Sequence, residues 1–147
     1  MDSIPHITVA AIIESDQHFL LIEEESDGLI MINQPAGHVE IGETLIEAVV
    51  RETLEESAWH FIPEAIIGIY QYTSSINGIT YIRVAFYGQH HSHQPDRPLD
   101  TGILRTLWLS RDEVAQNQSV RSPMVLQGID DFLIGRRYPL SMFKAMN

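Results

Sequence analysis

The sequence predicts an α/β fold of the mixed-sheet (α+β) type, in which helices cover the faces of the sheet. Short apolar, β-branched runs separated by turn residues indicate strands on both sides of one central amphipathic helix. Two more helices with their own capping residues are expected near the C-terminal end. The expected order is β-β-β-α-β-β-β-α-α. A chain of 147 residues is long enough to bury a core, and we expect residues 1–147 to form a single domain.

The first three expected strands lie before the central helix. Residues 7–13 are apolar and β-branched, and residues 19–22 follow a polar turn at residues 15–17. This pattern indicates a β-hairpin formed by the two runs. Asp27 and Gly28 mark another turn, which precedes a third strand at residues 29–32.

The central helix is expected over about residues 44–57. Thr44 is followed three residues later by Glu47, the spacing of a capping box. Strands are then expected at residues 66–73 and 80–87, joined by a hairpin turn at Asn77 and Gly78. A last strand is expected at residues 105–109.

Two helices are expected after that strand. Ser110 and Glu113 form a second capping box, and Ser122 followed by Pro123 is typical of a helix start. Gly135 lies where the C-cap of this last helix belongs. The apolar stripe that predicts the helix consists of Val125, Ile129, Phe132 and Leu133.

Composition excludes several classes of function. The formal net charge is −11, which argues against a nucleic-acid partner held by a basic patch. No apolar run approaches the roughly eighteen residues of a membrane helix, and residues 1–6 lack the basic flank of a signal peptide. With no cysteine, disulfides, a thiolate nucleophile and a cysteine-based zinc site are all excluded. We therefore expect a cytoplasmic protein with neither membrane nor nucleic acid as a partner.

The central helix carries an unusual acidic stripe. At about 100° per residue, Glu52, Glu55 and Glu56 fall on the face whose first half is apolar. Two carboxylates about 5 Å apart repel each other by roughly 3 kcal/mol at an effective dielectric constant near 20, so the cluster requires a cation. Oxygen-only ligands favour Mg²⁺, with Mn²⁺ as a substitute. A cation there would attract and polarise phosphates and lower the pKa of a bound water, which predicts hydrolysis of phosphoanhydride bonds.

The same segment carries a resemblance to a known family. Gly37, Glu43 and residues 51–59 resemble the Nudix box, the signature of hydrolases that act on nucleoside diphosphates linked to another moiety. Thr53 and Ala58 depart from the box, at its apolar position and its helix-exit glycine. If the helix ends as in the box, Ala58 adopts a left-handed conformation. The resemblance implies a Nudix-type α/β/α sandwich with a metal-binding loop–helix–loop.

The resemblance also implies roles for the acidic side chains. Glu52, Glu55 and Glu56 match the metal-binding glutamates of the box. Gly37 either offers its carbonyl oxygen to the metal or is simply a turn glycine. The catalytic candidates are Glu55, Glu56, Arg51 and Glu43, and either Glu56 or a carboxylate outside the box activates the water.

Arg51 and Glu43 are expected to support the site. Arg51 can pair with Glu47 one turn back or, by resemblance, with Glu43 to orient the loop before the helix. The negative charge of Glu43, just before the helix, also interacts favourably with the helix N-terminus. We expect Glu43 to support the metal ligands rather than to bind the metal directly.

The substrate is expected to be a small nucleotide or pyrophosphate. Residues 6–10, 33–38, 121–123 and 137–140 resemble the bacterial NudJ branch, phosphatases of nucleoside tri- and diphosphates that also accept thiamine-type pyrophosphates. One alternative is a Nudix pyrophosphatase for ADP-ribose or dinucleoside polyphosphates. Another is a nucleotide sensor without activity, although no metal glutamate is missing here. Monomer and homodimer remain open. The candidates for binding phosphate or base are Arg83, Arg121, Arg137 and Tyr138.

Histidines 90, 91 and 93 form a tract that superficially indicates a zinc site. They lack a cysteine partner and lie near Pro95 and Pro98, so we expect a solvated loop between two strands instead. His38 is expected to be a hydrogen-bonded structural histidine.

Overall fold

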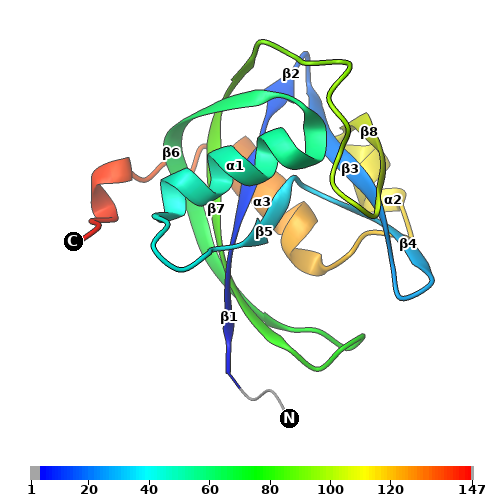
Figure 1. The fold of residues 1–147 in the computed structure, drawn as a ribbon, viewed down its shortest axis with the longest axis horizontal. Helices are drawn as coiled ribbons and strands as arrows, with labels where there is room; N and C mark the ends of the chain where they lie inside the picture. The colour runs from blue at the N-terminus through cyan, green and yellow to red at the C-terminus, as the bar shows by residue number, and fades with distance from the viewer. Residues whose placement is uncertain (1–3, 147) are drawn as a thin grey trace.

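The computed structural model describes residues 4–146 (Figure 1). It contains strands, three α-helices and one 3₁₀ turn among the described residues. In chain order these are β1 (His6–Ile12), β2 (Glu14–Ser15), β3 (His18–Ser26), β4 (Leu29–Asn33), β5 (Ala36–His38), α1 (Leu45–Ser57), β6 (His60–Thr73), β7 (Thr80–His91), β8 (Ile103–Ser110), α2 (Arg111–Gln116), α3 (Pro123–Leu133) and η1 (Leu140–Met142).

The strands form two sheets, one mixed and one antiparallel, and together with the helices they confirm the predicted fold class. The first sheet has the order β5-β1-β7-β6, with β1 parallel to β7 and the other neighbours antiparallel. In the second sheet β3 pairs with β2, β4 and β8, always antiparallel. No helix in the described part of the chain is long and apolar enough to cross a lipid bilayer.

Side-chain alternation along β1 explains why helices cover both faces of the first sheet. Val9, Ala11 and Ile13 belong to the apolar cluster that also contains residues of α1. Ile12 belongs to the other cluster, together with Ile129 of α3. Because successive side chains of a strand point to opposite faces, a strand that is apolar on both faces is buried between two helical layers. This arrangement is the predicted α/β/α sandwich.

Helix α1 begins and ends as the sequence predicts. The Thr44 hydroxyl accepts a hydrogen bond from the Glu47 N–H at 3.0 Å, and the Glu47 carboxylate accepts one from the Thr44 N–H at 2.9 Å. At the other end Ala58 has φ 62° and ψ 17°, so the expected left-handed conformation is confirmed. Its N–H donates to the Leu54 carbonyl. The capping box at Ser110 and the Ser122 cap are confirmed in the same way.

The predicted hairpin between residues 7–13 and 19–22 is wrong. β1 pairs with β5 and β7, whereas β3 lies in the other sheet. The turn at residues 15–17 closes the short β2–β3 pair, and one further hydrogen bond, from the Leu20 N–H to the Ile13 carbonyl, joins the two predicted runs. Both apolar runs are buried on both faces, and such a pattern does not reveal which strand is the partner. Strand β5 is not predicted from the sequence. Strand β6 begins at His60, whereas the predicted strand begins at residue 66.

The solvated-loop interpretation of the histidine tract is wrong for His90 and His91, which end strand β7. The His90 ring packs edge-on against Trp59 with centroids 4.7 Å apart, and the His93 ring stacks on Trp59 at 4.5 Å. The tract thus packs on Trp59 through His90 and His93, although His91 and His93 remain exposed. No group of three metal-ligating side chains in the described residues includes a histidine.

Candidate active site

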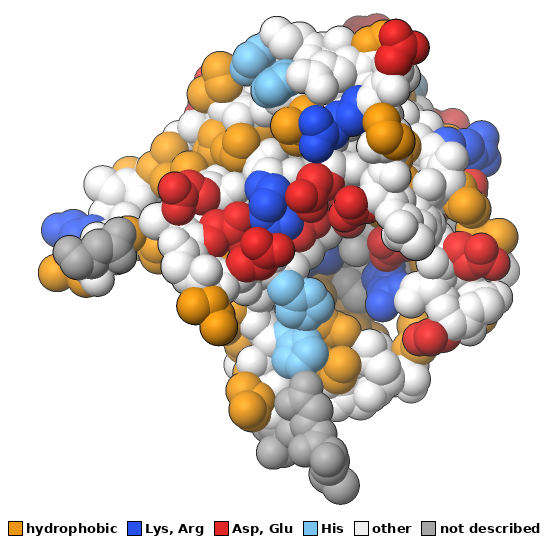
Figure 2. Space-filling view, viewed as in Figure 1, with side chains coloured by type: hydrophobic (Ala, Val, Ile, Leu, Met, Phe, Trp, Pro, Cys, Tyr) orange, Lys and Arg blue, Asp and Glu red, His pale blue; other side chains and the backbone are white. Residues whose placement is uncertain are grey.

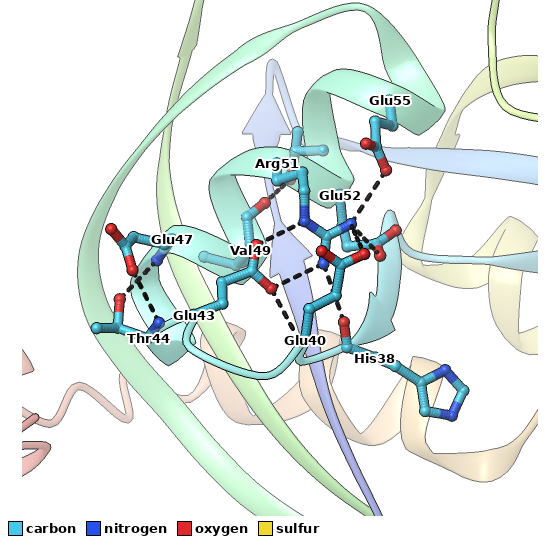
Figure 3. Close-up of polar contacts among 10 residues, drawn as sticks. His38, Glu40, Glu43, Thr44, Glu47, Val49, Arg51, Glu52 and Glu55 are labelled. Atoms are coloured by element: carbon cyan, nitrogen blue, oxygen red, sulfur yellow. Dashed lines mark hydrogen bonds and ion pairs between the residues drawn. The ribbon is translucent and has the colours of Figure 1, made fainter.

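Arg51 of α1 organises the acidic face of the helix (Figure 3). Its guanidinium makes a two-point contact with Glu43, at 2.6 Å from Nε and 2.9 Å from Nη2. Nη2 also donates to the His38 carbonyl at 3.0 Å, and Nη1 donates to Glu52 at 2.8 Å and Glu55 at 3.1 Å. One cation therefore connects the loop before the helix to two carboxylates of the helix.

This geometry decides between the two expected partners of Arg51. The partner is Glu43, while the Glu47 carboxylate is engaged in the capping box. Hydrogen bonds from Arg51 lower the pKa of the Glu43 carboxyl, and those same bonds raise the pKa of the Arg51 guanidinium. Glu43 is accordingly ionised, and its carboxylate is held by the Arg51 guanidinium.

Three carboxylates converge beside Arg51. Glu52, Glu55 and Asp100 each offer one oxygen, and these oxygens lie within 4.8 Å of one another. Asp100 lies in the segment between β7 and β8, and its N–H donates to the Glu55 carbonyl at 3.0 Å. Asp100 is not among the site residues that the sequence predicts, because no local spacing connects it to α1. Its only signal is an acidic residue in a proline-containing loop.

Glu56 is buried to the same degree as Glu52, with 9% of its surface exposed against 8%. Its Oε1 accepts a hydrogen bond from the Ala36 N–H at 2.9 Å. Burial, together with the nearby charges of Glu52, Glu24 and Asp100, raises the pKa of Glu56 to about 9, although the Ala36 hydrogen bond acts in the opposite direction. Burial also raises the pKa of Glu52, although the Arg51 hydrogen bond acts in the opposite direction. Desolvated, mutually repelling carboxylates of this kind fit a divalent cation as their partner.

Gly37 lies directly against the Glu52 carboxyl group. Gly37 belongs to β5 and pairs with Val9, so it is not a turn residue. A β-carbon at this position would collide with the carboxyl carbon and both carboxylate oxygens of Glu52. A side chain at this position is therefore compatible with the fold only if the Glu52 carboxylate leaves its contact with Arg51.

A cavity of about 350 Å³ opens beside these carboxylates. Figure 2 shows a hollow next to a gathering of acidic side chains with basic groups among them. Gly37, Glu52 and Glu56 line one end of it, and Arg83 and Arg121 also line it.

Arg83 is almost completely buried, with 5% of its surface exposed. Its Nη1 and Nη2 donate to Gln34 Oε1 and Asn33 Oδ1, each at 3.0 Å. Its Nε has no hydrogen-bond partner among the described residues. Burial lowers the pKa of Arg83 to about 10, so it remains a cation at neutral pH. Arg121 is more exposed, and its Nη1 lies 3.6 Å from Glu24.

Arg137 and Tyr138, two of the candidates for binding phosphate or base, lie outside this cavity. The Arg137 guanidinium lies over the Phe132 ring at 4.2 Å, and the Tyr138 backbone pairs with Ile66 of β6. Helix α3 carries the chain away from the cavity after Arg121, which local sequence motifs do not reveal.

A family model described as the NUDIX domain matches residues 4–127. The chain belongs to the Nudix family. It is 36% identical over 143 residues to phosphatase NudJ of Escherichia coli K12, covering 97% of this chain and 93% of the relative. A solved Nudix hydrolase from Nitrosomonas europaea is 49% identical, with a TM-score of 0.94 and coverage of 97% of this chain and 98% of that one.

More distant solved structures share the fold. An ADP-ribose pyrophosphatase from Streptococcus suis superposes with a TM-score of 0.69 at 17% identity, covering 92% of this chain and 96% of that one. Together the family model and the relatives identify the chain as a Nudix hydrolase. Nudix hydrolases generally use a divalent metal, and the acidic cluster of this Nudix hydrolase provides suitable oxygen ligands.

Proposed function

We propose that this Nudix hydrolase is a Mg²⁺-dependent phosphatase that releases orthophosphate from nucleoside di- and triphosphates and accepts thiamine-type pyrophosphates. The observation that carries the proposal is a cavity lined by two carboxylates of α1, Glu52 and Glu56, and by the buried Arg83, which has no ion-pair partner among the described residues. Glu52 also belongs to the carboxylate cluster with Glu55 and Asp100. Anionic phosphates require both the cation that such carboxylates hold and the positive charge of the arginines.

Glu52, Glu55, Glu56 and the Gly37 carbonyl are the proposed ligands of Mg²⁺, and Mn²⁺ would serve as a substitute. When bound, the cation neutralises phosphate charge and lowers the pKa of a water molecule. Arg51, itself paired with Glu43, holds Glu52 and Glu55 in place. Arg83 and Arg121 are proposed to contact the substrate from the other walls of the cavity.

Asp100 is the proposed acceptor of the proton from the attacking water. It is exposed and lies beside Glu52 and Glu55. Glu56 is less suited to this role because its Oε1 already accepts the Ala36 N–H and the side chain is buried. A carboxylate at the solvent edge can also pass the proton on to water.

Asp100→Asn is expected to lower kcat by about a hundredfold, the lower end of the usual contribution of a general base. Asp96→Asn, in the same segment but outside the acidic cluster, is the matched control and should retain wild-type turnover. The measurement is steady-state phosphate release at saturating Mg²⁺. Equal rates for the two variants would remove Asp100 from the mechanism.

The size of the cavity favours mononucleotides over ADP-ribose. At about 350 Å³ it lies near the small end of ligand pockets. A substrate with a second nucleoside or ribose arm needs further lined space. The identity to phosphatase NudJ across nearly the whole chain supports the same assignment.

CDP and GDP are expected to yield the nucleoside monophosphate and orthophosphate, and only when MgCl₂ is present. Thiamine diphosphate should likewise release orthophosphate. ADP-ribose should be hydrolysed much more slowly than either nucleotide. Phosphate detection combined with chromatography of the products measures this. If AMP forms from ADP-ribose faster than CMP forms from CDP, the protein is instead a pyrophosphatase of the ADP-ribose type. Release of orthophosphate without a divalent cation would contradict the proposed metal dependence.

A further inference from the structure

The cavity has a second end whose side chains differ from those around the carboxylates. Tyr72 of β6 and Tyr81 of β7 line it and stand directly opposite each other in the strand register. Tyr81 is in turn paired with His6 of β1, whose ring packs edge-on against it with centroids 5.7 Å apart. Side chains that face each other across strands point to the same face of a sheet, so three rings form one row.

The next row along the strands is polar. Arg83 follows Tyr81 by two residues and is paired with Thr8 of β1. Thr8 is paired with His38 of β5, and all three line the cavity. With period-two alternation, this row lies on the same face as the aromatic row. Its Arg83 has hydrogen-bond donors that the contacts to Asn33 and Gln34 leave unused, since a guanidinium carries five N–H groups.

The carboxylates lie one row further on. Ala36, whose N–H is bonded to Glu56, is paired with Ala10 of β1. From Ala10 to His6 the strand spans about 13 Å at roughly 3.3 Å per residue. The phosphates of a ligand would lie at the carboxylates. Any part of that ligand at the two tyrosines must then be about this far from the phosphates, as the base of a nucleotide is.

We propose that Tyr72 and Tyr81 form the platform on which the flat heterocycle of the substrate stacks, with Arg83 donating to acceptors between ring and phosphates. This inference rests on the proposed function for the nature of the ligand, and it assigns the residues that select the organic part. Stacking on aromatic side chains tolerates different bases, because every base has a π face. The site would therefore discriminate strongly between ligands with and without a ring, and weakly among rings.

The turn between β6 and β7 holds the platform in place. Asn77 Nδ2 donates to the Tyr81 hydroxyl at 2.9 Å, and the Asn77 Oδ1 accepts the Ile79 N–H at 2.9 Å. The turn thus fixes the outer end of the Tyr81 side chain, and Asn77 acts as a positioning residue for the ring. A ring that is already fixed loses less conformational entropy when a ligand stacks on it.

Equilibrium binding of CMP and ribose 5-phosphate to the full chain, measured by calorimetry with MgCl₂ present, tests the platform. The two ligands differ by the ring. The wild type is expected to bind CMP at least tenfold more tightly. Tyr81→Leu and Tyr72→Leu should each weaken CMP binding by about tenfold and leave ribose 5-phosphate unchanged. Tyr81→Phe keeps the ring but loses the hydroxyl that Asn77 holds, so it should weaken CMP binding by clearly less than Tyr81→Leu does.

Tyr87→Leu is the matched control, because Tyr87 lies on the same strand but packs against Phe132 outside the cavity. It should bind both ligands as the wild type does, and melting temperatures verify that each variant is folded. Equal affinity of the wild type for the two ligands, no binding of CMP, or an equal loss of both ligands in Tyr81→Leu would overturn the platform. Ligand binding does not require turnover. If the protein binds CMP more tightly than ribose 5-phosphate but releases no phosphate from nucleotides, the proposed function is contradicted while the platform is supported.

Discussion

Glu56→Gln is expected to reduce turnover by at least about a hundredfold while the protein stays folded. The amide retains the shape of the side chain and an oxygen for the Ala36 N–H, but it removes the charge that a cation needs. A bound cation supplies several kcal/mol of charge stabilisation in the transition state, which is the origin of the expected loss. Phosphate release at saturating MgCl₂ measures the effect.

The same substitution has a defined consequence for stability against pH. The pKa of Glu56 is raised from 4.5 to about 9 in the folded protein, so the folded state retains a proton that the unfolded state loses above pH 4.5. This group's contribution to the free energy of unfolding is complete below pH 4.5 and is lost as pH rises through about 9. In metal-free buffer, the melting temperature of Glu56→Gln should therefore fall less than that of the wild type between pH 5 and pH 9.

Two further measurements make this prediction specific. Adding MgCl₂ should raise the melting temperature of the wild type more at pH 8 than at pH 5, because a cation binds the ionised carboxylate. Glu47→Gln on the same helix is the matched control; its amide oxygen can retain the capping box, so activity should be unchanged. Full activity of Glu56→Gln, or its unfolding in metal-free buffer, would contradict the assigned role.

Gly37→Ala is expected to abolish most activity through one added carbon atom. The new β-carbon would occupy the position of the Glu52 carboxyl group, which has to move. Since Glu52 is a proposed cation ligand tied to Arg51, its displacement should weaken both metal binding and turnover, the latter by at least about a hundredfold. Phosphate release and the rise in melting temperature on adding MgCl₂ are the two measurements.

The double variant Gly37→Ala/Glu52→Ala separates steric from chemical effects. Removing the Glu52 carboxyl relieves the collision, so the melting temperature in metal-free buffer should recover relative to Gly37→Ala. Activity should stay low, because a cation ligand is now missing. Wild-type turnover in Gly37→Ala would show that Glu52 does not need its observed position.

Sequence alone determined the features that depend on near neighbours in the chain. The start of α1 follows from Thr44 and Glu47, three residues apart, and its acidic face follows from helical periodicity over residues 52–56. The left-handed end at Ala58 was predicted from the family resemblance and the extended pattern that follows. These features form within one or two helical turns, and distant parts of the chain have little influence on them.

Tertiary structure decided which segments meet. It brought Asp100 to Glu52 and Glu55, placed β1 beside β7 instead of β3, and carried Arg137 and Tyr138 away from the cavity. The aromatic row also depends on tertiary structure, since Tyr72, Tyr81 and His6 become neighbours only through strand register. Strand pairing is settled by the burial of both faces of a sheet and by loop closure over long separations, and neither leaves a local pattern in the sequence.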